Sequence, residues 1–495
     1  MNKITYILSI MVLAGILFQC KDALVEEPLT QYSVSNLTPA SAVAAVNGIY
    51  EPMQRSRGRY YESWFMSVIE SKGDYVIGRD AVYRDFARFI HTTSNYQSRI
   101  TAFWNIMYEA IGRANNLINA LQTSNLEASL RNELEAEART VRAFNYYNLV
   151  RLWGEVPLRL QSVQGVNDLA KGLSSREDIY DAIIADLEFA EDNLPSNRPE
   201  NELGRVTEGA AKLFLADVYL TMGTESNDNT LLALARDKAK EVIDNKAIYG
   251  YELVPSYPDI FSESANTTSE EVWAIKFIEQ IGFGSFIPVY LNDPANRNNG
   301  PRGLRTIYGN DQSPLLNNWD DNDLRKNWNI YTEFVNVNGV TQPITSVPSG
   351  ILFSKFRASS APEETAAGND FHLFRFADAL LIFAEAENLT NGPTTTAYDA
   401  VNQIRRRSYG FDVNTPNAMS DFPAGLTPDQ FDDLIIQERA YEFMTELKRW
   451  FDLKRKGIIA ETLNNSGPER AGFYTTELEY WTIPQVEIDN NPALQ

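Results

Sequence analysis

The stretch EAEARTVRAFNYYNLVRLWGEVPL, residues 135–158, carries the pattern on which the fold depends. Its apolar residues recur at helical intervals, at Ala138, Val141, Tyr146, Leu149 and Leu152. Because this spacing places them on one face, it predicts an amphipathic helix over about residues 130–152. Gly154 follows, and glycine suits the end of a helix. We therefore expect this helix to bury one face against neighbouring helices.

Similar periods occur on both sides of this stretch. They predict helices over about residues 40–53, 103–121, 175–194, 207–222, 231–245, 371–389 and 398–408. Ser175 and Thr207 stand where N-terminal caps are needed. Thr427, Pro428 and Gln430 form a capping box before a helix predicted to run to Lys456. Paired helices of this kind are typical of tetratricopeptide-like hairpins, although the chain has no regular repeat of about 34 residues.

Residues 254–370 have a different texture from the helical parts. The run NDPANRNNGP at residues 292–301 is rich in turn-forming residues, and VWAIKF at residues 272–277 is prone to form a strand. We therefore expect a mainly α fold that is interrupted by an irregular, loop-rich region with a few short strands.

Composition removes several classes of function. The 495 residues include 44 Lys and Arg against 66 Asp and Glu, for a net charge of -22. A nonspecific nucleic-acid binder needs a basic surface, so this class is excluded. His91 and His372 are the only histidines, too few for a His-rich zinc cluster. Residues 320–323 lack the continuation of a calcium loop, and we expect no metal and no cofactor.

The N-terminus has the features of an exported lipoprotein. A short basic start precedes the mostly apolar residues 4–18, which are too few to span a membrane comfortably. The sequence LFQC at residues 17–20 resembles a lipobox, and it ends in Cys20, the single cysteine of the chain. We expect residues 1–19 to be a signal peptide, Cys20 to be lipidated, and residues 20–39 to form the lipidated N-terminus and a tether.

Motifs spread along the chain are similar to those of one family. Residues 135–158 resemble the family's helix that ends in FG.vPL, and FRFADALLIFAEA at residues 374–386 is similar to its RYADVLLmyAEA. Further matches follow in order at residues 400–407, 438–455 and 481–492. On these residues, the chain is identified as a member of the SusD/RagB family of surface nutrient-binding lipoproteins from Bacteroidetes.

The resemblance implies a single SusD-like domain with four tetratricopeptide-like hairpins as its scaffold. Residues 40–253 and 371–495 would supply the helices, and residues 254–370 the ligand-side region. It implies a non-enzymatic, surface-exposed protein, anchored by lipid to the outer membrane, that captures an oligosaccharide or polysaccharide. It also implies a partner, a TonB-dependent SusC-like transporter, to which the glycan passes.

Three other functions stay open at this point. The same fold can bind a peptide or another nutrient, and helical repeats often bind protein alone. A surface glycoside hydrolase needs only two suitably placed carboxylates, and a count of 66 acidic residues does not decide that question.

Charged residues in the C-terminal motifs are expected to be structural rather than catalytic. Arg375, Asp378 and Glu385 lie three and seven residues apart, so they can share one helix face and exchange charge-assisted hydrogen bonds. Glu438 and Glu442 are expected to be neutralised by nearby arginines.

Aromatic residues outside the periodic helices are the candidates for sugar binding. Sugar rings pack their C–H faces on aromatic rings, while their hydroxyls bond to polar side chains. The predicted aromatics are Tyr83, Phe86, Phe283, Phe286, Tyr290, Tyr308 and Trp319. The predicted polar companions are Asn292, Asp293, Asn296 and Arg297. Their placement follows the rough location of the site in the family, and local packing under a long loop is the alternative for each aromatic.

Overall fold

The computed structural model describes residues 37–54, 60–61, 64–163, 165, 168–263 and 267–494. The predicted signal peptide, Cys20 and most of the predicted tether lie outside the described residues. One large hydrophobic core draws on all three predicted parts of the chain, from Ala42 in the first helix to Trp481 near the C-terminus.

Long helices dominate the first half of the described chain. They are α2 (Pro39–Gln54), α5 (Ser94–Gln122), α6 (Ala128–Trp153), α7 (Arg176–Asn193), α8 (Glu208–Ser226) and α9 (Asn229–Asp244). The predicted caps are confirmed, because the side chain of Ser175 accepts the backbone N–H of Asp178 and that of Thr207 accepts the N–H of Ala210. Gly154, at φ 78°, ends α6.

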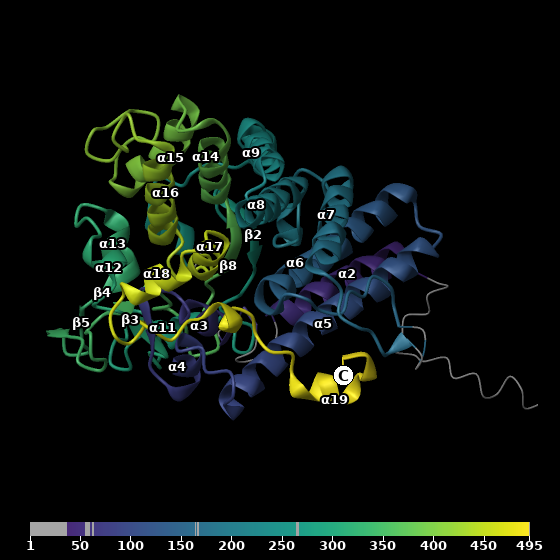
Figure 1. The fold of residues 1–495 in the computed structure, drawn as a ribbon, viewed down its shortest axis with the longest axis horizontal. Helices are drawn as coiled ribbons and strands as arrows, with labels where there is room; N and C mark the ends of the chain where they lie inside the picture. Colours follow the sequence, from purple (N-terminus) through teal and green to yellow (C-terminus); the bar gives the residue numbers. More distant parts are fainter. Residues whose placement is uncertain are drawn as a thin grey trace, which may run out of the picture.

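These helices stack side by side in a continuous row (Figure 1). The order of packing is α2, α5, α6, α7, α8, α9 and then α14 (Phe376–Asn391), which is followed by α15 (Thr395–Ser408) and α16 (Pro428–Glu442). α9 and α14 are neighbours although more than 130 residues separate them in the sequence. The helical scaffold is therefore completed by the C-terminal part of the chain.

The intervening segment lies beside this row and holds most of the strands (Figure 1). Four two-stranded antiparallel pairs form: β1 (Val76–Gly78) with β3 (Ile307–Gly309), β2 (Glu271–Ile275) with β8 (Phe371–Arg375), β4 (Ile330–Tyr331) with β7 (Leu352–Phe353), and β5 (Glu333–Val335) with β6 (Thr341–Pro343). Short helices connect them: α3 (Trp64–Glu70), α4 (Ala81–Ala87), α10 (Lys246–Tyr249), α11 (Ile287–Leu291), α12 (Pro314–Asn317) and α13 (Leu324–Asn329). The C-terminal helices are α17 (Arg449–Arg455), α18 (Ile459–Asn464) and α19 (Gln485–Asn490), and 3-10 turns cover Glu200–Glu202, Tyr257–Phe261, Thr476–Leu478 and Pro492–Leu494.

Two predicted helices depart most from the structure, and α5 also begins at Ser94 rather than at residue 103. The helix expected over residues 371–389 begins as strand β8, because Phe371–Arg375 pairs with β2 before α14 starts. The helix that starts after Thr427 ends at Glu442 rather than Lys456. Thr445 and Leu447 have φ values of 62° and 65°, which an α-helix cannot contain, so the backbone turns there before α17 begins.

A buried ion cluster joins the loop-rich region to the helical scaffold. The Arg375 guanidinium lies 2.5 Å from Glu270, 2.8 Å from Glu442 and 2.8 Å from Glu446. Glu442 also bonds to Arg325 and Arg407, at 2.9 Å and 2.7 Å. Burial raises the pKa of the Glu442 carboxyl, but the three arginines outweigh it and hold the pKa well below its ordinary value.

The charged residues of the C-terminal motifs are buried in ion pairs, as predicted, but some of their partners differ from the predicted ones. Glu442 and Glu438 are neutralised by arginines as expected, with Glu438 bonded to Arg325 and Arg405. Arg375 lies on β8 rather than on a helix. Asp378 accepts its backbone N–H, and Glu385 pairs instead with Arg455. The expectation of one shared helix face was therefore wrong.

We expect Asp452 to make the stability of the protein depend on pH below about 4. Burial raises the pKa of this carboxyl, but Arg439 and Arg455 lower it to about 2, from an ordinary value of 3.8. A depressed acid pKa stabilises the fold above the ordinary value, and this stability is lost as the pH falls through the folded value. The pH-dependent part amounts to about 2 kcal/mol.

Urea unfolding of the wild type and of Asp452→Asn between pH 2 and pH 6 checks this. The difference in unfolding free energy should shrink as the pH falls from about 4 to about 2. A difference that stays constant over this range would contradict the assignment.

Candidate functional site: an aromatic and cationic surface

Four aromatic residues, Trp64, Tyr83, Phe286 and Tyr290, meet where α3, α4 and α11 come together. The Trp64 indole N–H donates a 2.7 Å hydrogen bond to the Tyr290 hydroxyl. The Tyr83 ring stands edge-on to Tyr290, with ring centroids 6.4 Å apart, and Phe286 packs on the other part of the Tyr290 ring at 5.4 Å. Trp64 is half-buried, whereas Tyr83 and Tyr290 are buried beneath it. The arrangement is a fixed platform with Trp64 at its surface.

Arg99 supplies a cation on this platform. Its guanidinium lies 3.3 Å from the centroid of the Trp64 ring, within the range of a cation–π contact. Among the described residues, no carboxylate lies within ion-pair distance of Arg99, and its buried Nε has no hydrogen-bond partner. Burial lowers the pKa of this guanidinium from its ordinary value. An arginine in this state has donors available for a ligand.

Arg305 extends the cationic surface on the neighbouring loop. Its backbone adopts φ 44°, a left-handed conformation that is uncommon for a residue other than glycine. Burial, and then the like charge of Arg79, lower the pKa of its guanidinium. Its Nε donates to the Ser346 carbonyl at 3.3 Å. The next residue, Thr306, donates its backbone N–H to the Tyr290 carbonyl at 2.8 Å, so the Arg305 backbone lies near the platform.

Hydrogen bonds fix the segment of residues 292–296, which follows α11. The Tyr331 hydroxyl donates to the Asn292 side chain and accepts the backbone N–H of Asp293, both at 2.9 Å. The Asn292 amide donates to the Asn296 carbonyl at 2.6 Å. Asn292, Asp293 and Asn296 are buried and bond within their own segment, and their contact with a ligand stays a prediction.

The structure brings some predicted site residues together and removes others from the surface. Tyr83, Phe286 and Tyr290 share the platform, although their burial gives them a supporting role. Tyr83 and Phe86, expected outside the periodic helices, lie on the short helix α4. Phe86 packs in the core against Tyr96 and Trp481, and Trp319 is stacked on Tyr441 with ring centroids 4.4 Å apart. Phe86 and Trp319 are therefore packed in the interior, which was the alternative to ligand binding for each aromatic residue.

Three predicted residues keep an accessible side chain. Phe283 is 56% exposed, Arg297 is exposed and Tyr308 on β3 is half-buried. Ligand contact through these three stays a prediction. Trp64 and Arg99 were not predicted. A tryptophan outside the periodic helices was the available signal for Trp64, whereas Arg99 lies on a long helix and only the folded chain brings it to the tryptophan.

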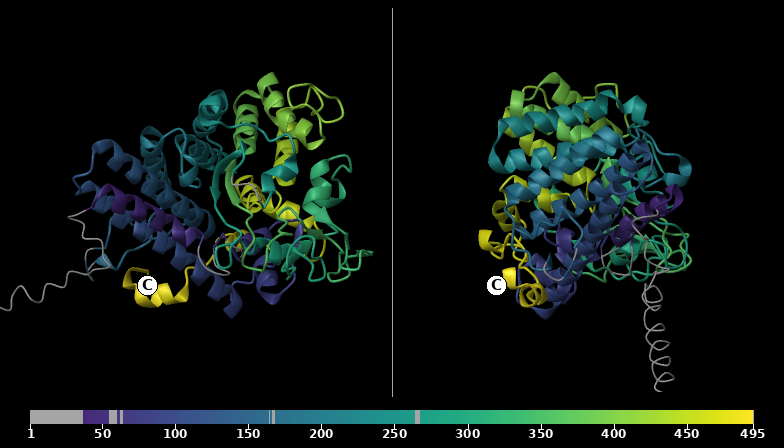
Figure 2. Two further views of the ribbon diagram at one scale, coloured as in Figure 1. Left: turned by 180° about the vertical axis from the view of Figure 1, so that it is seen from behind. Right: turned by 90° about the vertical axis from the view of Figure 1, so that its right-hand side faces the viewer.

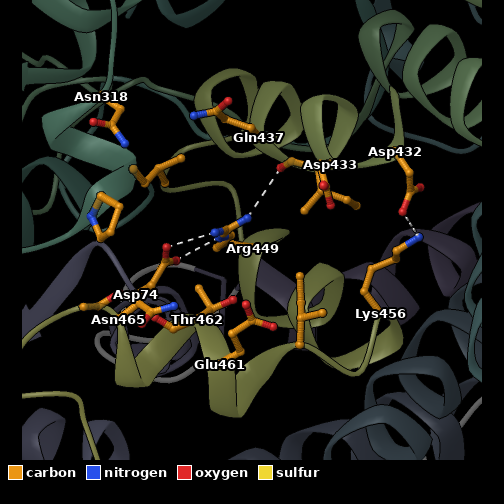
Figure 3. Close-up of a pocket in the computed structure, with 15 residues that line it drawn as sticks. Asp74, Asn318, Asp432, Asp433, Gln437, Arg449, Lys456, Glu461, Thr462 and Asn465 are labelled. Carbon is orange, nitrogen blue, oxygen red and sulfur yellow. Dashed lines mark hydrogen bonds and ion pairs between the residues drawn. The ribbon is translucent and has the colours of Figure 1, made fainter. Parts of the chain in front are cut away.

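A separate cavity of about 490 Å³ lies between α12, α16 and α18 and has a different chemistry (Figure 3). Its charged groups are largely paired, because Arg449 bonds to Asp74 at 2.8 Å and Lys456 to Asp432 at 2.5 Å. None of the described residues that line it is aromatic. It lacks a wall on which a sugar ring can stack, so it fits a structural role better than glycan binding.

The two histidines lie in the interior. Burial lowers the pKa of His91 to about 4 and that of His372 to about 3, so both are neutral at physiological pH. In the described parts of the chain, no three His, Cys, Asp or Glu side chains gather closely enough to hold a metal ion. Nor does any helix within the described ranges have the length and apolar character required to cross a bilayer.

Gly78 fixes the position of α4 beneath the platform. A Cβ atom at this position would lie 2.5 Å from the backbone carbonyl carbon of Tyr83 and 2.7 Å from the Arg84 nitrogen. We expect Gly78→Ala to reduce the unfolding free energy by about 1–2 kcal/mol, because the backbone must move. Gly48→Ala is the matched control, since nothing lies within 4 Å of its Cβ position in α2. Urea unfolding of the wild type and both variants tests this. A Gly78→Ala protein as stable as Gly48→Ala would contradict it.

Two family models match this sequence. The model described as "SusD family" matches residues 295–495, and the model described as "Starch-binding associating with outer membrane" matches residues 43–220. The chain belongs to the SusD family. SusD-like protein P2 of Formosa agariphila is 28% identical to it, over 99% of this chain and 98% of the relative.

Solved structures confirm the expected SusD-like, mainly helical fold. A SusD superfamily protein from Parabacteroides distasonis has a TM-score of 0.79 at 23% identity, covering 93% of this SusD-family chain and 99% of its own. Surface glycan-binding protein A from Bacteroides thetaiotaomicron, in complex with laminarihexaose, has a TM-score of 0.74 at 20% identity and covers 92% and 98% of the two chains.

Proposed function

We propose that this protein is a cell-surface carbohydrate receptor that captures an oligosaccharide or polysaccharide and does not cleave it. The observation that carries the proposal is the Arg99 guanidinium, which stacks on the half-buried Trp64 and has no ion-pair partner among the residues that the structure describes. An aromatic ring beside unpaired hydrogen-bond donors is the combination that a sugar requires, since the ring meets C–H groups and the donors meet hydroxyls. The laminarihexaose complex of a structural neighbour supports the same ligand class.

The net charge of -22 favours a neutral glycan over a polyanionic one, because long-range repulsion opposes an anionic chain. Over distances below the Debye length of about 8 Å, Arg99 provides local positive charge, and its N–H groups can donate to hydroxyl and ring oxygens. The site therefore suits a neutral saccharide that is held by stacking and by arginine donors.

The proposal includes a location and a partner. Family membership and the lipobox-like sequence before Cys20 support an outer-membrane lipoprotein that is anchored through Cys20 and exposed at the cell surface. A TonB-dependent SusC-like transporter would receive the glycan. Metabolic labelling with a radioactive fatty acid, lost in Cys20→Ala, tests the anchor, and co-purification from outer membranes tests the partner.

Isothermal titration of residues 21–495 with neutral plant, host and microbial oligosaccharides tests the ligand class. We expect binding to at least one of these sugars, and chromatography should recover the sugar intact. Binding of peptides alone would replace the ligand class with the peptide alternative. Cleavage abolished by a single carboxylate substitution would establish a hydrolase and overturn the proposal.

A further inference from the structure

A second cavity, of about 640 Å³, lies between α5, the loop after α6 and the C-terminal helix α19. Figure 1 shows α19 close to α5, and Figure 2 gives two further views of the C-terminal end; Glu487 and Asn490 of α19 line one side of the cavity. Four residues that line it occupy successive turns of α5, at Trp104, Tyr108, Gly112 and Asn116. Their spacing of four places them in one stripe of the helix. The volume lies in the usual range for a small-ligand site.

Two aromatic rings form a rigid wall of this cavity. The centroids of Trp104 and Tyr108 lie 4.8 Å apart, and Trp104 packs edge-on against Trp153 at 5.4 Å. The Tyr108 hydroxyl donates to the Pro157 carbonyl at 2.8 Å, which fixes the ring while leaving it half-buried. Because these contacts already fix the two side chains, a sugar ring can bind to them without a loss of side-chain freedom.

Gly112 leaves the middle of the α5 stripe open. A Cβ atom there would meet nothing within 4 Å, so packing does not explain the glycine. A glycine inside a helix costs roughly 0.5–1 kcal/mol relative to alanine. In this protein, the glycine leaves free space one helical turn from Tyr108, in the middle of the residues of α5 that line the cavity.

Some of the polar side chains around the cavity are available for a ligand. The side-chain amides of Asn105, Asn116, Gln161 and Asn490 are exposed and have no hydrogen-bond partner within the described ranges. These groups are neutral donors and acceptors, suited to hydroxyl groups.

We propose that this cavity is a second saccharide-binding site, which takes neutral sugar rings against Tyr108, supported from beneath by Trp104, and bonds their hydroxyls through the surrounding amides. One carboxylate, Glu487, and one guanidinium, Arg159, line the cavity, so its charges balance and a neutral sugar suits it. The inference rests on the proposed function, and it adds a second point of attachment on the same chain. Two sites on one receptor raise the avidity for a long glycan.

Titration with short sugars tests the second site. The probes are laminaritriose, maltotriose and xylotriose, chosen because a trisaccharide is short enough to occupy one site at a time. Gly112→Leu places a side chain into the cavity from a Cβ position that has nothing within 4 Å, and Gly48→Leu does the same on α2, outside this cavity. Trp64→Ala removes the first platform. Melting temperatures verify that each variant is folded.

We expect the wild type and Gly48→Leu to bind two equivalents of at least one trisaccharide. Gly112→Leu should lose one equivalent, or weaken it at least tenfold, and Trp64→Ala should lose the other. Asn116→Ala should weaken the same equivalent as Gly112→Leu. If Gly112→Leu binds as the wild type does while Trp64→Ala loses binding, the second site is refuted and the proposed function stands. If no probe, and no sugar of the larger panel, binds the wild type, both proposals fail.

Discussion

Glu442→Gln is expected to reduce the unfolding free energy by about 3–5 kcal/mol, the range for breaking a buried charge network. The Glu442 side chain is fully buried and bonds to Arg325, Arg375 and Arg407. The neutral amide leaves these arginines with too little negative charge, and burial prevents water from replacing it. Since Arg325 lies on α13 and Arg407 on α15, the loss should loosen the loop-rich region from the helical scaffold.

Urea unfolding at pH 7 measures this change, and Glu461→Gln is the matched control. Glu461 is exposed on α18, so its substitution should alter stability by no more than about 0.5 kcal/mol. If Glu442→Gln does not accumulate as folded protein, Arg407→Lys keeps one positive charge and should give a smaller, measurable loss. A Glu442→Gln protein within 1 kcal/mol of the wild type would contradict the role of the cluster.

Trp64→Ala is expected to raise the dissociation constant for the preferred oligosaccharide about a hundredfold at the platform. Removal of an aromatic anchor at the centre of a binding surface typically costs more than about 2 kcal/mol, and a hundredfold change is about 2.7 kcal/mol. Trp64→Phe keeps a ring but loses the hydrogen bond to Tyr290, so its effect should be smaller. Calorimetric titration measures all three proteins.

Arg99→Ala should weaken the same binding about tenfold, because the guanidinium donors are lost while the Trp64 ring remains. Arg176→Ala is the matched control. Arg176 is also half-buried, but it lies on α7 and its charge is paired with Glu225. Equal affinity of the Arg99→Ala and Arg176→Ala proteins would remove Arg99 from the site.

The helical scaffold could be predicted from local signals. Apolar residues at spacings of three and four, together with the caps at Ser175 and Thr207, place α6, α7 and α8 correctly because these signals lie within each helix. Strand β8 could not be separated from α14, because a short apolar run fits either structure and its partner β2 lies about 100 residues away. The end of α16 depends on the left-handed backbone of Thr445 and Leu447, which tertiary packing imposes.

The candidate site was harder to predict than the scaffold. An aromatic residue in an irregular segment fits the core as well as it fits a ligand, and Phe86 and Trp319 lie in the core for this reason. The functional signal of Arg99 is that it lacks an acidic partner among the described residues. That property follows from the three-dimensional arrangement of charges, and the residue type alone does not reveal it.

The central claim is that an intact glycan binds at the surface formed by Trp64 and Arg99. A crystal structure of the protein with the tightest-binding oligosaccharide of the panel tests it most directly. The account predicts an uncleaved sugar in contact with the Trp64 ring and hydrogen-bonded to the Arg99 guanidinium. A fully occupied sugar bound elsewhere, with both residues uncontacted, would contradict it.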